Sequence, residues 1–142
     1  MGGDVMNENI AAQVADLLNT QNQLTIQYDA KRVLNHAERY VVRLNDKEEV
    51  QGCIEVKRVQ WYQGEIDHLS VHPNARCKGL GTALLSEAEA RAKELGVRIA
   101  QCTIRVGNVE SESLFKKNGY TATVTFTNEK NGNQVTVYQK VL

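Results

Sequence analysis

The sequence predicts a single α/β domain over residues 1–142, built on a mixed, mostly antiparallel sheet. Three observations support this prediction. Segments with the helical period of apolar residues alternate with runs of strand-forming residues. One long helix stands between two strand-like runs, which is typical of a parallel crossover. The length of 142 residues fits one domain, and the sequence holds no repeat, linker or low-complexity tract.

Helices and strands are predicted along the first half of the chain from spacing and turn residues. The expected segments are helices at residues 9–18 and 29–37 and strands at residues 39–44, 50–59 and 63–71. Asp29 is an expected N-cap, and Val33 and Leu34 are expected to face inward. Pro73 ends the third strand, because proline cannot donate to a ladder of hydrogen bonds.

The second half of the chain begins with the clearest helix, at residues 79–95. Its apolar stripe consists of Leu80, Ala83, Leu84, Ala88, Ala92 and Leu95. Gly96 is the expected left-handed C-terminal cap. The segments that follow are a strand at residues 97–105, a helix at residues 108–117 and a hairpin of residues 121–127 and 134–141. The sheet should therefore be antiparallel at both ends, with a parallel crossover in the middle.

Composition and charge exclude several classes of function. Hydrophobic residues make up 42% and charged residues 24%, which is the balance of a soluble globular protein. Lys and Arg total 17, as do Asp and Glu, so no net field attracts a nucleic acid. No apolar run is long enough to cross a membrane, and the N-terminus lacks a signal-peptide pattern. We therefore expect a cytoplasmic protein that binds neither nucleic acid nor membrane.

The three cysteines are widely spaced and form no C-x-x-C pair. This pattern argues against a disulfide framework and against a metal site. Cys53 and Cys102 lie in apolar runs and are expected in the core, whereas Cys77 lies in a loop.

This loop, between the third strand and the long helix, is the part of the sequence that most strongly indicates chemistry. Exposed N–H groups at a helix start bind phosphate oxygens, and the positive end of the helix dipole adds to the attraction. Gly79 and Gly81 would let an anion approach the backbone, and Arg76 and Lys78 add positive charge. Alternatively, the two glycines only permit a tight turn. The P-loop string does not occur, and Leu84 replaces the last glycine of the dinucleotide-binding pattern.

Two motifs resemble those of the GCN5-related N-acetyltransferases (GNAT family). R-C-K-G-L-G, beginning at Arg76, resembles the loop [Q/R]-x-x-G-x-[G/A] that binds acetyl-CoA in that family. The family's next motif, N-x-x-[A/S]-x-x-L-[Y/F]-x-K-x-G-[F/Y], is matched by Asn108, Ser111, Leu114, Phe115, Lys117, Gly119 and Tyr120. The resemblance implies the three-layer GNAT fold, whose two central parallel strands splay apart around the coenzyme.

The resemblance also implies which residues hold acetyl-CoA. They are Leu69, Val71, Arg76, Cys77, Lys78, Gly79, Leu80, Gly81, Thr82, Asn108 and Phe115. In the family, loop N–H groups hold the pyrophosphate, and strand backbone near Leu69 and Val71 pairs with the pantetheine arm. Asn108 is equally well suited to cap a helix. His72 is expected to be structural. Lys117 is expected to face solvent, with a contact to the coenzyme adenine as the alternative.

The resemblance implies direct transfer of the acetyl group to an amine, so no enzyme nucleophile is required. Glu65 is the first candidate for general base, because histone-acetylating members carry a glutamate six residues before the position of Val71. Asp67 and His68 could replace it, and Glu65 could instead be a solvated strand-end carboxylate. The backbone N–H of Leu69 is the candidate oxyanion donor. In a regular strand, Glu65, Asp67 and Leu69 lie on one face, but a bulge would change which residues share that face.

Phe115 marks a departure from the family, because many members carry a tyrosine there that protonates the departing thiolate. Phenylalanine cannot donate a proton, so the general acid is unassigned. Tyr120 and Tyr138 are conceivable substitutes, although Tyr120 is expected in the core. Water or the acidity of the thiol itself could also serve.

The leading hypothesis is an acetyl-CoA-dependent N-acetyltransferase acting on a primary amine of a small molecule, peptide or protein. The alternative is a non-catalytic acyl-CoA-binding module with a sensing or regulatory role, which Phe115 favours. Trp61 and Tyr62 could line an acceptor pocket, form an oligomer interface or simply pack. A homodimer is expected only by analogy with the family.

Overall fold

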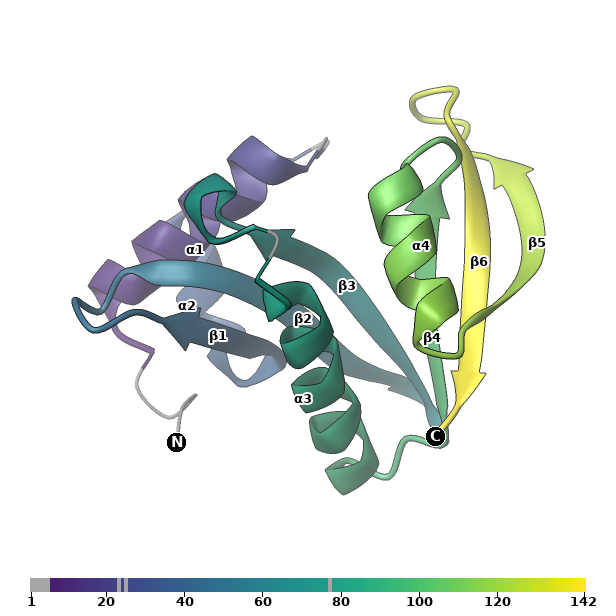
Figure 1. Ribbon diagram of the computed structural model, residues 1–142, viewed down its shortest axis with the longest axis horizontal. Coiled ribbons are helices and arrows are strands. Elements are labelled where there is room, and N and C mark those ends of the chain that lie inside the picture. Colours follow the sequence, from purple (N-terminus) through teal and green to yellow (C-terminus); the bar gives the residue numbers. More distant parts are fainter. Residues whose placement is uncertain (1–5, 23, 25, 77) are drawn as a thin grey trace. The chain divides into compact units, whose positions relative to one another are not determined.

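The structure is a computed structural model that describes residues 6–22, 24, 26–76 and 78–142 (Figure 1). In these residues it contains four α-helices and six strands. In chain order they are α1 (Glu8–Gln21), α2 (Ala30–Leu34), β1 (Tyr40–Leu44), β2 (Val50–Gln60), β3 (Gln63–Val71), α3 (Leu80–Glu94), β4 (Ile99–Arg105), α4 (Val109–Lys117), β5 (Thr121–Thr127) and β6 (Gln134–Val141).

The strands of the described residues form one sheet in the order β1-β2-β3-β4-β6-β5. β1 pairs with β2, β4 with β6 and β5 with β6, all antiparallel, whereas β3 pairs with β4 in parallel. The parallel register joins Gln63–Glu65 to Ile99–Gln101. This arrangement confirms the predicted mixed sheet, antiparallel at both ends, with a crossover through α3 in the middle.

The chain divides into two compact units. The first consists of Met1–Val56 and His68–Ala88, and the second of Lys57–Asp67 and Glu89–Leu142. β2, β3 and α3 each begin in one unit and end in the other. That the chain acts as one domain stays a prediction.

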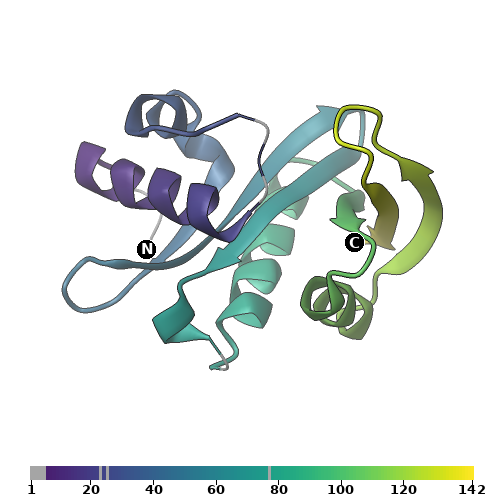
Figure 2. The ribbon, with the colours of Figure 1, turned by 90° about the horizontal axis from the view of Figure 1, so that it is seen from above.

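The first unit has three layers, with α1 and α2 on one face of the strands and α3 on the other (Figure 2). Ile10, Val14 and Leu18 of α1 belong to a buried cluster that includes Tyr40 and Cys53 on the strands. Gly52 faces α3, where an added Cβ would lie only 2.8 Å from a methyl group of Leu84. A side chain at position 52 would therefore push α3 away from the sheet.

In the second unit, α4 lies along one face of β4 and β6 (Figure 1). Within this unit, the part-buried Glu89 of α3 makes polar contacts with Tyr120 and Lys140. The Tyr120 hydroxyl donates to Glu89 Oε2 at 2.8 Å, and Lys140 Nζ lies 3.0 Å from Glu89 Oε1. Lys140 also lies over the Tyr120 ring, 5.6 Å from its centroid. Tyr120 is buried, as its expected core role requires.

Most predicted boundaries agree with the structure to within one or two residues, and three strands agree at both ends. α1 is longer than predicted at both ends, because Asn7 supplies the N-cap and Asn22 the C-cap. α2 is shorter than predicted and is followed by a 3₁₀ turn, Ala37–Arg39. Asn35 ends it by donating its N–H to the carbonyls of Lys31 and Val33.

Two apolar residues were wrongly predicted to face inward. Leu34 is the last residue of the short α2 and is 36% exposed. Leu95 lies one residue beyond α3 and is also exposed, whereas Leu85, which the predicted stripe omitted, is buried. The error at Leu95 comes from extending helical periodicity past the end of α3, whereas Leu34 is exposed at the C-terminal end of an α2 that is shorter than predicted. The predicted caps at Asp29 and Gly96 are confirmed, the glycine by its φ of +87°.

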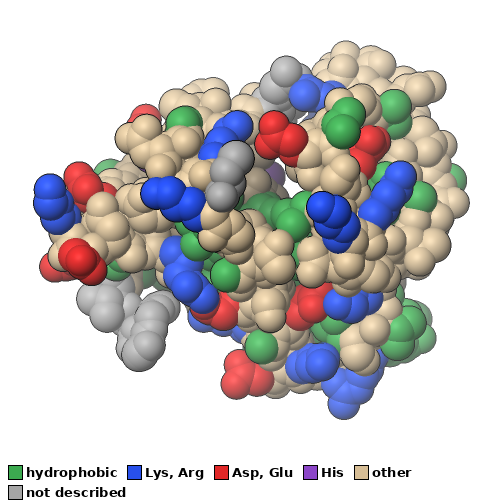
Figure 3. All heavy atoms as spheres, in the orientation of Figure 1, with side chains coloured by type: hydrophobic (Ala, Val, Ile, Leu, Met, Phe, Trp, Pro, Cys, Tyr) green, Lys and Arg blue, Asp and Glu red, His purple; other side chains and the backbone are tan. Residues whose placement is uncertain are grey.

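Basic and acidic side chains are interspersed on the face drawn in Figure 3, as the balanced charge predicts. No helix in the described part of the chain is both long enough and apolar enough to cross a membrane.

The two described cysteines are buried, as predicted, and burial raises the pKa of each thiol to about 12 from an ordinary value of 9.0. Nearby Glu55 adds to the shift at Cys53, and Asp67 and Glu65 add to it at Cys102. Cys77 lies outside the described residues.

These thiols should make the protein less stable at alkaline pH. As pH rises through about 9, the thiols of the unfolded chain ionise while those of the folded chain stay protonated, so the unfolded state binds fewer protons. Each thiol should therefore lower the free energy of unfolding by up to about 1.4 kcal/mol per pH unit between about pH 9 and 12. Urea titrations in reducing buffer should show a shallower pH slope for Cys53→Ala and Cys102→Ala. Unchanged slopes would contradict the assignment.

Candidate active site

The loop between β3 and α3 is held in a defined conformation at its start. The His72 N–H donates to the Gln51 carbonyl of β2 at 2.8 Å. The His72 side chain accepts from the Asn74 N–H at 3.1 Å, which caps the 3₁₀ turn Pro73–Ala75. His72 therefore has the structural role predicted for it, and the loop leaves β3 in a fixed direction.

Gly79 ends this loop with an open backbone. Its carbonyl accepts from the Ala83 N–H at 3.1 Å, the first bond of α3, so Gly79 occupies the N-cap position. Its φ of +75° lies in the left-handed region, which residues with a Cβ rarely adopt. An added Cβ would meet nothing within 4 Å, so the space beside this backbone is free. The first turn of α3 therefore presents its N–H groups beside an open surface.

Positive charge lies on the same loop. Arg76 and Lys78 are both exposed, and the Arg76 guanidinium donates to the side chain of Gln21, the last residue of α1. Thr82 is exposed, while Leu80 and Gly81 are half-buried. An exposed helix start with two cations is the arrangement expected of a phosphate site. The predicted contact of Cys77 lies outside the described residues.

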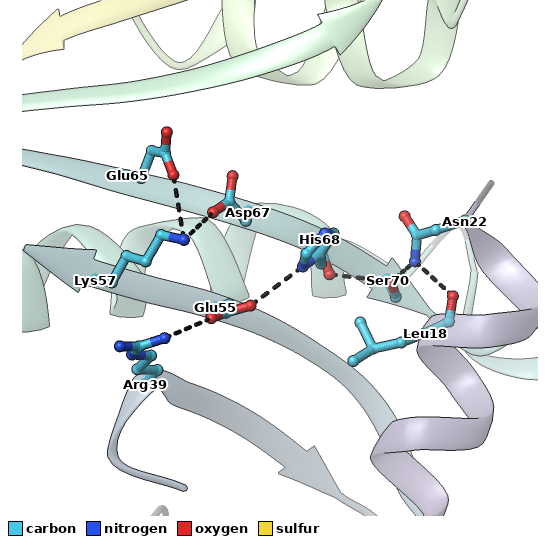
Figure 4. Close-up of polar contacts among 9 residues, drawn as sticks. All are labelled: Leu18, Asn22, Arg39, Glu55, Lys57, Glu65, Asp67, His68 and Ser70. Carbon is cyan, nitrogen blue, oxygen red and sulfur yellow. Dashed lines mark hydrogen bonds and ion pairs between the residues drawn. The ribbon is translucent and has the colours of Figure 1, made fainter. Parts of the chain in front are cut away.

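A buried carboxylate and a histidine meet beside the end of β3, in the same compact unit as the loop (Figure 4). Glu55 Oε1 lies 3.2 Å from His68 Nδ1, and the Glu55 side chain is only 7% exposed. Arg39 Nη1 lies 3.9 Å from the other carboxylate oxygen. The largely buried carboxylate of Glu55 thus has a guanidinium and an imidazole as its partners.

Two tyrosines interact with this pair, Tyr28 with His68 and Tyr40 with Glu55. The Tyr28 ring lies edge-on to His68 at 5.9 Å, and the Arg32 guanidinium lies 5.0 Å from the Tyr28 ring centroid. Burial, and then the charge of Glu55, raise the pKa of the Tyr40 hydroxyl well above its ordinary value. Tyr40 therefore stays neutral at physiological pH.

His68 of β3 has a φ of +56°, which lies in the left-handed region. Lys57 Nζ of β2 lies 3.8 Å from Asp67 Oδ2. Glu55, two residues before Lys57 and therefore on the same face of β2, contacts the next residue of β3, His68. Asp67 and His68 are consecutive in β3, yet both contact side chains on one face of β2. Regular alternation would place them on opposite faces, so we infer a β-bulge at His68.

Side chains of α1 and β3 hold this unusual backbone in place. The Ser70 hydroxyl donates to the His68 carbonyl at 3.0 Å and accepts from Asn22 Nδ2 at 2.8 Å. Asn22 Nδ2 also donates to the Leu18 carbonyl at 3.0 Å (Figure 4). A left-handed conformation at a residue with a Cβ costs on the order of 1 kcal/mol or more, and it persists where its surroundings fix it.

Glu65, the first base candidate from the sequence, belongs to the second unit. Its Oε1 lies 3.5 Å from Lys57 Nζ, and the same ammonium contacts Asp67. All three side chains retain some exposure to solvent. Glu65 therefore has a cationic partner of its own, as Figure 4 also shows.

The residues matching the second family motif lie in the same unit as Glu65. The Asn108 side chain accepts from the Ser111 N–H at 3.3 Å, so its predicted capping role is confirmed. The Phe115 ring is buried and lies edge-on to Tyr120 at 5.0 Å between ring centroids. Whether these two residues also contact the coenzyme stays a prediction.

Neither Glu55 nor Tyr28 was predicted from the sequence as part of a site. One signal for Glu55 was available: it is the only charged residue in the apolar run Cys53-Ile54-Glu55-Val56. A carboxylate in a buried strand usually has a specific partner. Among the residues that the structure describes, no group of three or more His, Cys, Asp or Glu could hold a metal ion.

Solved structures confirm the fold. Ard1 from Thermoplasma volcanium superposes with a TM-score of 0.82 at 18% identity, over 96% of this chain and 93% of that one. YncA from Salmonella typhimurium, solved with its cofactor acetyl-CoA, gives 0.81 at 20% identity, over 96% and 90%. Ribosomal-protein-alanine N-acetyltransferase from Brucella melitensis gives 0.75 at 22% identity, over 94% and 93%. Comparison with curated protein sequences gave no significant match.

The sheet order and the open helix start define an α/β protein with an exposed, glycine-containing loop at the end of a central strand. The sequence model of the acetyltransferase (GNAT) family matches residues 7–120, which is well over half of the chain. The chain therefore belongs to the acetyltransferase (GNAT) family, as the two motifs predicted.

Proposed function

We propose that the protein is an acetyl-CoA-dependent N-acetyltransferase, which moves an acetyl group directly to a primary amine of a small molecule, peptide or protein. The observation that carries the proposal is the His68–Glu55 pair, which lies in the same compact unit as the glycine-containing loop. Such a transfer needs a proton acceptor and a site for the phosphates of the donor, and this unit offers a candidate for each. Family membership and the acetyl-CoA complex of the Salmonella protein support the choice of donor.

The loop fits the phosphate end of acetyl-CoA. The open space at Gly79 and the exposed Arg76 and Lys78 favour a pyrophosphate at the start of α3, held by N–H groups from position 77 to Thr82. The backbone of Leu69 and Val71 would pair with the pantetheine arm, and the Leu69 N–H would donate to the acetyl oxygen as charge develops there. Asn108 and Phe115 are the proposed coenzyme contacts from α4.

His68 is the proposed general base. When its Nδ1–H donates to Glu55, the lone pair is on Nε2, which can accept a proton. The amine nitrogen bonds to the acetyl carbon as the carbon–sulfur bond breaks, and the amine proton passes to Nε2. Glu55 holds the ring in orientation and stabilises the imidazolium that forms. Glu65 is the alternative base, and its contact with Lys57 is the reason that we rank it second.

The departing thiolate takes its proton from water in this proposal. Phe115 has no proton to give, and the Tyr120 hydroxyl already donates to Glu89. Burial raises the pKa of Tyr120 far above its ordinary value, and the hydrogen bond and the charge of Glu89 add to the shift. Burial also raises the pKa of Tyr138. Because the thiol of coenzyme A is itself acidic compared with these phenols, solvent suffices as the proton source.

Turnover with a panel of amines tests the proposal. We expect release of free coenzyme A thiol from acetyl-CoA in the presence of one or more classes among small amines, lysine peptides and peptides with free N-termini. Calorimetric titration with acetyl-CoA runs in parallel. Binding without thiol release from any acceptor would favour the non-catalytic acyl-CoA-binding module instead. Absence of binding would overturn both.

A further inference from the structure

The outer strand of the second unit, β5, is exposed along its whole length. β5 is the last strand in the sheet order, and all seven residues from Thr121 to Thr127 are exposed. Its sequence, T-A-T-V-T-F-T, contains no charged residue and no proline. An edge strand offers unpaired N–H and C=O groups to any other strand, and natural proteins usually block such edges with lysine, proline or a bulge.

The opposite edge of the sheet shows what such protection looks like. β1 has five residues, and a register shift at Arg43 and Leu44 breaks its pairing with β2 near the end. Arg43 places a charge on the strand and forms an ion pair with Glu87 of α3. Both edge strands have a register shift, but β1 is short and charged, whereas β5 is longer and uncharged. The protein blocks one edge and leaves the other available.

The regular part of β5 is self-complementary. A register shift between Ala122 and Val124 interrupts the start of the strand, after which it pairs with β6 in regular order to Thr127. Val124 lies opposite Val137 and Phe126 opposite Val135, so these four apolar side chains share one face. Val124 is 55% and Phe126 46% exposed.

A two-fold axis through Thr125 would pair this segment with itself. In that antiparallel register, Thr125 lies opposite Thr125 of a second copy, and Val124 lies opposite Phe126 of that copy. Residues an even number of positions apart keep the same face, so all apolar side chains meet on one face and the threonines on the other. An aromatic residue beside a β-branched one is a favourable cross-strand pair.

We propose that β5 is a dimerisation edge, which pairs antiparallel with β5 of a second copy of this chain about an axis at Thr125. The two sheets then join into one continuous sheet, and the exposed Val124 and Phe126 of both copies cover one another. Within the regular part of β5, residues 124–126 of each strand take part, so the buried surface is small and the dimer is weak and concentration-dependent. This proposal does not depend on the acetyltransferase activity.

Sedimentation velocity tests the proposal on the full chain over about a hundredfold range of concentration, because the dimer population follows mass action. We expect wild type to shift from monomer to dimer. Phe126→Lys and Val124→Lys should each raise Kd by at least about tenfold, because each change occurs twice in the interface and about 1.4 kcal/mol is a factor of ten. The matched control is Val59→Lys, an equally exposed valine on β2, which should dimerise as wild type does.

A cysteine pair tests the register itself. Across the axis, two residues at position 125 have Cα atoms about 4.5–5.5 Å apart, within disulfide reach, whereas those at position 127 are about 14 Å apart. In a Cys77→Ser background, with the buried Cys53 and Cys102 left in place, Thr125→Cys should therefore form a disulfide dimer on mild oxidation. Thr127→Cys should not. A wild-type protein that stays monomeric, or a dimer unaffected by Phe126→Lys, would overturn the proposal.

Discussion

His68→Ala is expected to lower kcat/KM by about 10²–10⁴-fold while leaving the affinity for acetyl-CoA within about twofold of wild type, because positioned general bases contribute rate enhancements of that size. His68 approaches the buried Glu55 at 3.2 Å, and the loop that would hold the coenzyme makes no described bond to its ring. Steady-state kinetics with the best acceptor from the amine panel, together with calorimetry, separates the two effects.

Three matched variants sharpen this prediction. His36→Ala removes an exposed histidine of the same unit and should have no effect. Glu55→Gln keeps the shape of the side chain but cannot stabilise an imidazolium, so we expect a loss of about 10–100-fold. Glu65→Gln should cost less than tenfold if His68 is the base. The base-dependent rise of the pH–rate profile should disappear in His68→Ala.

The opposite pattern would reassign the base. If Glu65→Gln abolished turnover and His68→Ala did not, the glutamate predicted from the family pattern would be the proton acceptor. His68 would then help to form the binding site for the acceptor without taking its proton. Because both side chains lie on β3 but have different partners, the two variants distinguish these mechanisms without a bound ligand.

The fold was predictable because its signals are local. The hairpin of β5 and β6 follows from alternating polar and apolar residues on either side of Asn131-Gly132, and Gly132 adopts the expected left-handed φ of +76°. The long helix α3 follows from its apolar stripe and from Gly96 after its end. In each case, residues close in sequence determine the conformation, so periodicity and caps suffice.

The His68–Glu55 pair was not predictable in the same way, because it depends on tertiary contacts. Glu55 and His68 are 13 positions apart in the sequence. They meet because the bulge places the His68 side chain on the same face as Glu55, whereas a regular strand would place it on the opposite face. The bulge is fixed in turn by Ser70 and by Asn22 at the end of α1. No local sequence pattern in β3 predicts the bulge or the contact between His68 and Glu55. The loop, by contrast, was found because a glycine at a helix start is itself a local signal.

Gly81→Glu is expected to abolish measurable binding of acetyl-CoA, raising Kd by at least about 100-fold. Gly81 is the second residue of α3, in the turn whose N–H groups face the proposed pyrophosphate. A carboxylate there repels the phosphates by several kcal/mol at the effective dielectric of a protein surface, and about 1.4 kcal/mol is a factor of ten in Kd. Calorimetric titration with acetyl-CoA and with coenzyme A measures the loss.

The same substitution should leave the fold as stable as before or more so, which separates lost binding from misfolding. Glutamate has a higher helix propensity than glycine by several tenths of a kcal/mol, and a negative charge in the first turn interacts favourably with the helix dipole. Ala90→Glu adds the same charge at an exposed position near the other end of α3 and should bind as wild type does. A Gly81→Glu protein with unchanged affinity would mean that the helix start is only a cap. Lost affinity at wild-type or higher Tm, with Ala90→Glu unaffected, would instead locate the phosphates at the start of α3.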